Sequence, residues 1–377
     1  MSGFFPDIRA AEGALQQEAF TRWQAMGDLR RREHWRWTPL DALRDDARRS
    51  EGADYQFDLP DAIGEDFGTF TEADRALLAL DDAAFAALNL ALLPDALQLT
   101  VPDDADLADI AALNIDLLAR RLQTSRIHIR AGKNSRSAFW IDYRVSRKGA
   151  QLPVITVDAA DGAQVDVALW FQGESGTAQV AQAAVQQANN SRVRLNALQA
   201  GGDLLRLDVH SELHGEGTHF AFGGVQLLAG SQIGDYHLNV RHLTENSESH
   251  QRVRGALDDA ALGIFDGMIY VAHGAQKTDA RQDSRYILLS DSARSHSVPR
   301  LEIYADDVQC AHGSTTGKVD EEALFYLRSR GIGYEAARKM LILSFLHEAV
   351  VVEHQTLADA VHQTISDIWL GDDEAAA

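Results

Sequence analysis

The sequence contains almost no cysteine. Cys310 is the single cysteine among 377 residues. One cysteine excludes an internal disulfide framework, and this usage is typical of proteins from a reducing compartment. We therefore expect a cytoplasmic protein.

Long hydrophobic runs are also missing. The two longest, Ala83 to Leu93 and Met340 to Val352, are too short to span a bilayer and are interrupted by polar residues such as Asn89 and His347. The stretch from Met1 to Arg9 lacks the basic start and apolar run of a signal peptide. These absences predict a soluble protein.

Positive charge is in deficit. There are 35 Lys and Arg residues against 56 Asp and Glu, so the formal net charge is -21. This balance argues against nucleic acid or an anionic membrane as a partner. It is typical of a solvated acidic surface, and it also suits a basic protein partner. A chain of this length predicts two or three structural regions around a large core.

Residues 1 to 96 are predicted to be a helical region. Ala10 to Leu29 is rich in helix formers, and Thr71 to Leu93 has apolar residues at helical spacing after a capping threonine. The tryptophans of Glu33 to Thr38 are predicted to pack against these helices, with a partner-facing anchor as the alternative. The polar stretch from Asp45 to Asp66 is interpreted as a linker.

Residues 97 to 308 are predicted to be a strand-rich core. Short alternating runs such as Arg126 to Arg130 and Leu205 to Val209 are separated by Gly, Asp or Asn, and long helical periods are mostly absent. Ala178 to Ala188 is an exception that is also compatible with a helix. Because no fixed-length repeat is evident, periodicity leaves a sandwich, a barrel and a coiled stack of strands open.

The stretch from Leu301 to Gly331 is predicted to be a last strand, a polar turn and the first helix of a closing segment. Asp320 is a good N-cap for that helix. Cys310 and His312 lie at the junction, and side chains two positions apart in an extended chain share a face. Residues 309 to 377 are therefore predicted to be a C-terminal helical region, with a long amphipathic helix from Gly331 to Val352.

Cys310 and His312 have side chains that suit iron. Thiolate is the usual ligand of iron-sulfur clusters, and imidazole replaces it in some of them. From the spacing alone, a buried cysteine beside a turn-capping histidine is the more ordinary interpretation. One cysteine cannot hold a cluster that normally takes four protein ligands, so a cluster site here requires a second chain.

Other histidines form no clear motif. Five of them lie in the strand-rich region: His237, His242, His250, His273 and His296. A metal site would require them to converge in space. Scattered surface or turn histidines are the favoured interpretation, and no catalytic residue is predicted.

Two motifs near the end of the chain resemble the SufD family, the D subunits of the SUF (SufBCD) iron-sulfur cluster assembly scaffold. They are the Asp-Asp-Val-x-Cys-x-His-Gly run from Asp306 to Gly313 and the Phe-Tyr-Leu-x-Ser-Arg-Gly-Ile run from Phe325 to Ile332. The B subunits typically have His-Glu-Ala where this chain has His312 to Ser314, which favours the D family. The resemblance continues through Asp235 to His242 and Gly267 to Val271.

The resemblance implies a right-handed parallel β-helix between two helical regions. It also implies a non-catalytic scaffold subunit that pairs with a SufB-like paralogue and a SufC-like ABC-type ATPase. A transient iron-sulfur cluster is expected at the partner interface, with none bound tightly by this chain alone. His312 is the preferred ligand, because the B subunits keep a histidine at the matching place, and Cys310 is an auxiliary one. A homodimer remains an alternative.

The helix after Gly331 is predicted to dock the ATPase. The residues predicted to do so are Ile332, Tyr334, Glu335, Arg338, Met340 and His347. Covering the end of the β-helix is a second use for the same helix. The alternative function is a carbohydrate-active β-helix enzyme, a lyase or hydrolase. The missing signal peptide and the placement of tryptophans away from the strands argue against it.

Overall fold

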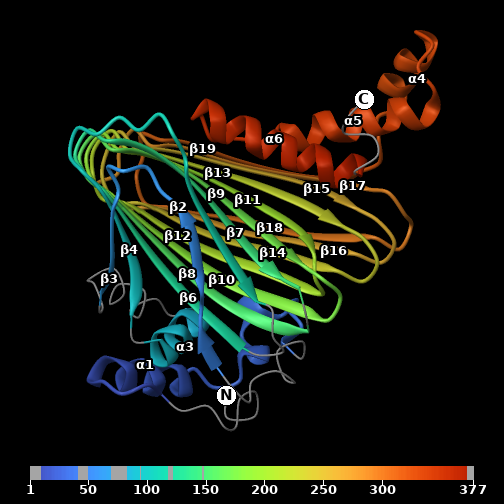
Figure 1. Cartoon of the computed structure of the whole chain (residues 1–377). Coiled ribbons are helices and arrows are strands. Elements are labelled where there is room, and N and C mark those ends of the chain that lie inside the picture. Colours follow the sequence, from blue (N-terminus) through green and yellow to red (C-terminus); the bar gives the residue numbers. More distant parts are fainter. Residues whose placement is uncertain are drawn as a thin grey trace.

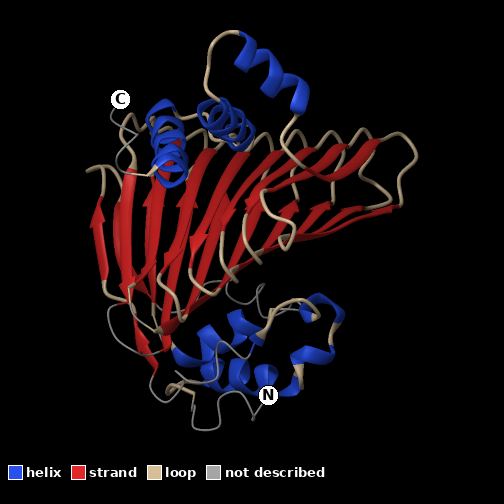
Figure 2. Ribbon diagram, turned by 90° about the vertical axis from the view of Figure 1, so that its right-hand side faces the viewer, coloured by secondary structure: helices blue, strands red, loops and turns tan. Residues whose placement is uncertain are grey.

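A computed structural model describes residues 10–40, 50–68, 83–93, 95–117, 122–146 and 148–371. Consecutive strands alternate between two long sheets, so that the chain winds through about eight turns of a parallel β-helix (Figure 1). Helices lie at both ends of the chain, one group on each side of the β-helix (Figure 2). The predicted class, a parallel β-helix flanked by helical regions, is confirmed.

Sheet A contains the even-numbered strands of the β-helix together with two strands from the N-terminal region. Its members are β1 (Ser50–Gly52), β3 (Gly64–Gly68), β4 (Ala96–Val101), β6 (Leu122–Ala131), β8 (Gly149–Ala159), β10 (Thr177–Gln187), β12 (Leu204–Leu213), β14 (Ile233–His242), β16 (Leu262–Val271) and β18 (Arg294–Ile303). From β4 to β18 each strand pairs in parallel with the next coil.

Sheet B contains the odd-numbered strands from β5 onward together with β2. Its members are β2 (Tyr55–Asp58), β5 (Ala111–Leu117), β7 (Arg136–Val145), β9 (Gln164–Gly173), β11 (Arg192–Gly201), β13 (His219–Leu228), β15 (Glu248–Leu257), β17 (Asp279–Leu288) and β19 (Gln309–Gly317). Strands β5 to β19 are parallel, while β2 is antiparallel to β5 and β3 is antiparallel to β4. The antiparallel pairs lie at the first coil.

The turns between the sheets repeat a left-handed backbone position. Asn134, Gly162 and Asn190 have φ values of 52°, 71° and 55°, a region that only glycine and asparagine adopt readily. Their amide groups donate to the carbonyls of Asp161, Asn189 and Glu216, the residues just before the next left-handed position. These Asn and Gly residues therefore hold each turn against the following coil.

The interior is mainly aliphatic, with polar rungs that bond to one another. Leucine, isoleucine, valine and phenylalanine side chains from both sheets form the largest core cluster. The buried glutamines Gln123, Gln151 and Gln179 stack across sheet A, with amide-to-carbonyl distances of 2.7 and 2.8 Å between neighbours. Each bond joins the amide of one coil to the amide of the coil before it and so offsets the cost of burying these polar groups, while the Oε1 of Gln179 has no partner among the described residues.

Helices cover part of the outer face of each sheet. The N-terminal helices, α1 (Ala14–Ala25) and α3 (Ala84–Leu92), pack on sheet A, and the short 3-10 turns η1 (Leu29–Arg31) and η2 (Glu33–Trp35) lie beside them. At the C-terminus, α4 (Glu321–Ser329) precedes α5 (Tyr334–His347) and α6 (Gln355–Leu370), and the last two pack on sheet B.

The stretch whose sequence was compatible with both a strand and a helix forms strand β10. The strand occupies most of Ala178 to Ala188. β10 pairs with β8 on one side and β12 on the other, its inner face lies in the core, and α3 lies on its outer face. A strand buried on both faces loses the alternation that sequence reading depends on.

The N-terminal region is only partly helical, so the predicted helical region 1 to 96 is wrong in part. Within the predicted linker, β1, β2 and β3 form from residues 50–58 and 64–68 and add to the two sheets. The later half of the helix predicted from Thr71 to Leu93 is α3, and residues 69–82 lie outside the described residues. Backbone pairing with an exposed first coil overrides the polar composition of this stretch.

The two tryptophans of the Glu33 to Thr38 segment lie in different environments. Trp35 is 1% exposed and contacts Phe85 of α3 with ring centroids 5.2 Å apart, which confirms packing against the chain's own helices. Trp37 is 40% exposed and stacks on His296 of β18 at 4.3 Å. The N-terminal segment therefore reaches the last strand of sheet A.

The β-helix also continues further than predicted. β18 ends at Ile303, and residues 304–308 turn into β19, which is the last strand. The predicted boundary at Val308 therefore falls inside the core, and Cys310 lies in a strand rather than between a strand and a helix. The core ends at Gly317, after a strand that completes the eighth turn.

His242 makes folding dependent on pH. It is fully buried between the hydroxyl groups of Ser247 and Ser249, and burial lowers its pKa to about 4. As pH falls below about 6.5, His242 binds a proton in the unfolded chain but stays neutral in the folded chain. The free energy of unfolding therefore decreases until about pH 4. We expect His242 to account for about 2 kcal/mol of lost unfolding free energy between pH 7 and pH 5.

Urea unfolding at both pH values measures this loss. The variant His242→Asn should show a smaller difference between the two pH values, even if it is less stable overall. His273→Asn, at an exposed turn position, serves as the matched control and should behave as the wild type. An unchanged pH difference in His242→Asn would contradict the assignment.

Candidate functional site

The two ends of the β-helix differ in their backbone pairing. β3 and β2 pair with the first coil, whereas β18 and β19 each have one neighbouring strand at the other end. Their outer edges therefore present rows of unpaired N–H and C=O groups, which is the usual template for pairing with another chain. Val298, Ile303 and Tyr304 add apolar surface at this end, each more than a third exposed. We call β18 and β19 the open end.

Cys310 and His312 both lie on β19 and share one face of it. They pair with Ala280 and Gln282 of β17, whose side chains are buried in the interior. Ala311 pairs with Arg281, which is exposed on the outer face. The register thus turns the thiol and the imidazole toward the interior of the last coil, where His312 is exposed because no further coil covers it.

The surroundings of Cys310 keep its thiol protonated. The side chain is half-buried against Ile269, Val271 and Ala280. Burial raises the pKa of the thiol, and the nearby carboxylate of Asp279 raises it further. The thiol is therefore inert at neutral pH until a metal displaces its proton.

Gln282 lies directly behind His312 in the interior. Its side chain is 2% exposed, and both amide atoms lack a hydrogen-bond partner in the described part of the chain. Buried amides are nearly always satisfied, so an unpaired one beside an open mouth marks a place where a further polar group fits. Sequence reading gave no signal for this residue.

Histidines elsewhere do not converge. His242 is inside, while the other four lie on the outer faces or at a turn: His237 and His296 on sheet A, His250 on sheet B and His273 after β16. Among the described residues, no group of three or more His, Cys, Asp or Glu side chains is placed to hold a metal ion. This agrees with the interpretation of scattered histidines.

The residues predicted to dock an ATPase lie on two different faces of the C-terminal segment. Tyr334, Glu335 and Met340 are exposed, and Ile332 and Arg338 are partly exposed. His347 instead packs between α5 and α6, with its ring centroid 4.5 Å from that of His362. It is held within the chain by this contact and is not part of the exposed surface.

The buried face of α5 consists of Ala337, Ile342 and Leu346, which are fully buried. Ile342 and Leu346 belong to the apolar cluster that α5 and α6 form with sheet B. Met340, one of the predicted docking residues, is exposed on another side of the helix.

Helix α4 carries the most exposed aromatic side chains of the described residues. Phe325 is 73% exposed and Tyr326 57% exposed, and Leu324 is the only fully buried residue of the helix. Figure 2 shows α4 projecting away from the β-helix. Together with Tyr334 and Met340 these side chains form an apolar surface that sequence reading placed only on the following helix. We call these four residues the α4–α5 surface.

A polar clasp holds the connection between α5 and α6 on sheet B. The amide of Asn196 on β11 donates to the carbonyl of Ala349 at 2.8 Å and accepts from the N–H groups of Val351 and Val352 at 2.8 and 3.1 Å. Asp166 on β9 accepts from the N–H groups of Glu353 and His354. These contacts fix the position of both helices, and sequence reading did not find them.

These observations define a class of protein: a parallel β-helix whose open end carries a thiol and an imidazole from one strand, too few ligands for a metal site of its own. Residues 115–345 match the family model described as SUF system FeS cluster assembly, SufBD core domain. The chain therefore belongs to the SufBD family of iron-sulfur cluster assembly proteins, and it is SufD-like.

Individual relatives agree with this family. The chain is 35% identical over 148 residues to the iron-sulfur cluster assembly protein SufD of Escherichia coli, and 35% identical over 158 residues to SufD of Bacillus subtilis. These alignments cover 39% and 42% of this chain and 35% and 36% of the relatives. A SufBD family protein of Mycobacterium tuberculosis is 26% identical over 344 residues, covering 85% of this chain and 83% of its own length.

No helix in the described ranges is long and apolar enough to cross a bilayer.

Proposed function

We propose that this chain is a non-catalytic scaffold subunit of an iron-sulfur cluster assembly complex. Its open end pairs with a SufB-like paralogue, its C-terminal helices hold a SufC-like ATPase, and a nascent cluster is built where the two β-helices meet. The observation that carries the proposal is the open end itself, with Cys310 and His312 facing its interior.

The donor set of this end fits a shared cluster. A thiol and an imidazole suit iron, yet two ligands from one chain leave a cluster without the four it normally takes. The nascent cluster is the cargo of such a complex, and its remaining ligands come from the partner. Gln282 behind His312 supplies an amide that can donate to a sulfide or to a partner side chain.

Co-expression with a SufB-like chain and a SufC-like ATPase tests the proposal. We expect the three chains to co-purify and the complex to accumulate clusters, followed by absorbance in the visible range, when iron, sulfide and reductant are supplied. A chain that stays alone in the presence of both partners would overturn the scaffold role. Clusters formed by the isolated chain would overturn the shared site.

The α4–α5 surface gives a separate prediction for the ATPase. Replacing Tyr334 and Met340 by serine removes two exposed apolar side chains, and interface residues of this kind cost more than about 1 kcal/mol each when they belong to a hot spot. We expect recovery of the ATPase with the purified complex to fall at least about tenfold, because 1.4 kcal/mol is a factor of ten. Pairing with the SufB-like chain should be unaffected.

Phe67→Ser is the matched control, because Phe67 is 55% exposed on β3 at the opposite end of the β-helix. Point substitutions are preferable to deletion of residues after Gly331. Deletion would uncover the apolar outer face of sheet B that α5 and α6 protect. Full ATPase recovery with the double variant would place the docking site elsewhere.

A further inference from the structure

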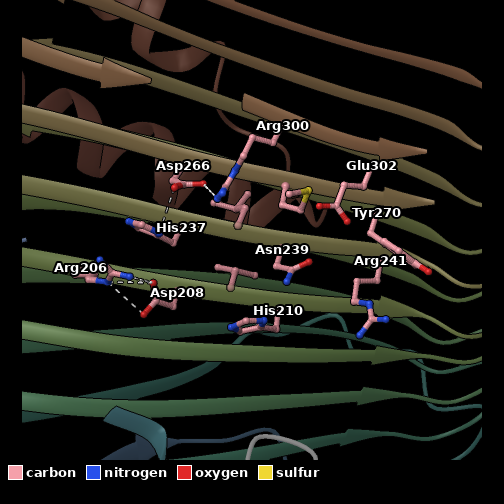
Figure 3. A pocket seen from close by; sticks show the side chains of 13 residues that line it. Arg206, Asp208, His210, His237, Asn239, Arg241, Asp266, Tyr270, Arg300 and Glu302 are labelled. Atoms are coloured by element: carbon pink, nitrogen blue, oxygen red, sulfur yellow. Dashed lines mark hydrogen bonds and ion pairs between the residues drawn. The ribbon is translucent and has the colours of Figure 1, made fainter. Parts of the chain in front are cut away.

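A polar pocket lies on the outer face of sheet A, next to the open end. It measures about 440 Å³ and is formed by side chains from β12, β14, β16 and β18 (Figure 3). The register places these side chains in rows across the four strands, since His210, Asn239, Met268 and Arg300 align, as do Glu212, Arg241, Tyr270 and Glu302. The size suits a small ligand or a single large side chain.

Along one side of the pocket, acidic and basic side chains alternate in a continuous series of ion pairs. The network runs in contact order through Asp208, Arg206, Asp235, His237, Asp266 and Arg300. Burial alone would raise the pKa of Asp235, but His237 and Arg206 outweigh it and lower the pKa to about 2. Asp235 is therefore ionised at neutral pH, and the acidic and basic side chains of the network pair with one another.

The arginines that line the pocket all have carboxylate partners. Arg206 pairs with Asp208 and Asp235, and Arg300 pairs with Asp266. Arg241 pairs with Glu212 at 3.3 Å and also lies over the Tyr270 ring, 5.0 Å from its centroid. None of these guanidinium groups carries positive charge that awaits an anion.

Glu302 is the exception among the acids. It is exposed on β18, and no ion pair or hydrogen bond joins its carboxylate to the described part of the chain. Figure 3 shows this carboxylate directed into the pocket, while the guanidinium of Arg241 turns away from it. The carboxylate of Glu302 is thus the one negative charge lining the pocket that has no partner among the described residues.

The floor beside Glu302 is suited to an alkyl chain. Met268 lines the pocket and is half-buried, and it aligns with Asn239 on β14. A thioether adapts to aliphatic neighbours, and the stems of lysine and arginine side chains cover apolar surface in the same way. Asn239 offers a carbonyl oxygen to an N–H donor, and it makes no hydrogen bond to the described residues.

We propose that this pocket binds an organic cation with an alkyl stem: a guanidinium or primary ammonium group paired with Glu302, its stem on Met268. The formal charge of -21 attracts such a ligand to the chain. A metal ion is a poor alternative, because no group of three metal-ligating side chains exists among the residues that the structure describes. The proposal is independent of the cluster site, since Glu302 faces outward on sheet A and His312 faces inward on sheet B.

Titration calorimetry with butylguanidinium tests the pocket on the full-length chain. Butylurea has nearly the same shape without the charge and should not bind. Methylguanidinium lacks three methylene groups of the stem and should bind at least about tenfold more weakly, because burial of each methylene group favours binding. Comparing agmatine with N-acetylarginine amide separates a free cation from a basic side chain of a polypeptide, and tighter binding of either one supports the cation chemistry.

Glu302→Gln should weaken butylguanidinium binding about tenfold or more, as expected for loss of a charged hydrogen bond. The control Glu248→Gln removes one exposed carboxylate from sheet B and makes the net charge less negative by the same amount, so it should bind as the wild type. Equal affinities in both variants, or equal binding of butylurea and butylguanidinium, would overturn the proposal.

Discussion

Replacing His312 by alanine is expected to stop cluster assembly in the reconstituted complex while the subunits still associate. The side chain is exposed at the open end and makes no hydrogen bond or ion pair to the part of the chain that the structure describes, so the variant should fold normally. Loss of an imidazole next to the thiol removes one of the two ligands that this chain offers. We expect the cluster yield to fall by at least about tenfold, the lower range for loss of a group that supports a metal site.

Cys310→Ala is expected to have a smaller effect. Its thiol is half-buried, and its raised pKa shows that the protein does not activate it for metal binding by itself. Visible absorbance and bound iron, measured on complexes of equal subunit composition, compare the two variants. His214→Ala, at an exposed position after β12 and away from the open end, is the matched histidine control.

The outcomes separate the two parts of the proposed function. Normal cluster assembly in His312→Ala would move the site elsewhere and leave the scaffold role in place. Loss of the complex itself would show that His312 supports subunit pairing rather than the cluster. Equal losses in Cys310→Ala and His312→Ala would contradict the ranking of the two ligands.

The strand content of the core could be predicted from the sequence, but its topology could not. β14 and β16 alternate buried and half-buried positions along their second halves, and such alternation is visible in the sequence. The same alternation occurs in sandwiches and barrels. The parallel winding followed from the family resemblance alone.

The coil repeat was hidden by its variable length. Ala178 pairs with Leu204, 26 positions later, whereas Leu262 pairs with Arg294, 32 positions later. Turns absorb these differences without disturbing the strands, so a search for one fixed period fails. The left-handed Asn and Gly positions at one row of turns are the signal that does persist, since each turn needs a residue that tolerates positive φ.

The site was only partly predictable for a similar reason. The shared face of Cys310 and His312 follows from their spacing of two in an extended chain. Contacts between distant segments leave no such pattern. Asn196 lies 153 positions before Ala349, and nothing in either local sequence indicates that they meet.

The clasp at Asn196 gives the second large expected effect. Its side chain is fully buried and makes four hydrogen bonds, two of them donated, to Gly223 and Ala349, and two accepted, from Val351 and Val352. Asn196→Ala leaves those backbone groups unsatisfied at about 1 to 3 kcal/mol each where water cannot reach them. We expect the local opening free energy of residues 348–354 to fall by about 3 kcal/mol, which is about 100-fold faster amide exchange.

Hydrogen exchange read by mass spectrometry on the full-length chain measures this change. Asn189→Ala is the matched control, because Asn189 is exposed at a turn and makes its contacts to neighbouring turn residues. Gly223→Ala probes the same contact from the sheet. A Cβ there would lie 1.9 Å from the carbonyl oxygen of Ala349, so the connection must lift to accommodate it.

Both variants should therefore expose residues 348–354 while the coils of the β-helix keep their protection. Because α5 and α6 are positioned by this connection, recovery of the ATPase with the complex should fall in the same order as the exchange rates rise. Unchanged exchange in Asn196→Ala would show that the apolar contacts of Ile342, Leu346 and Leu357 hold the helices without the clasp.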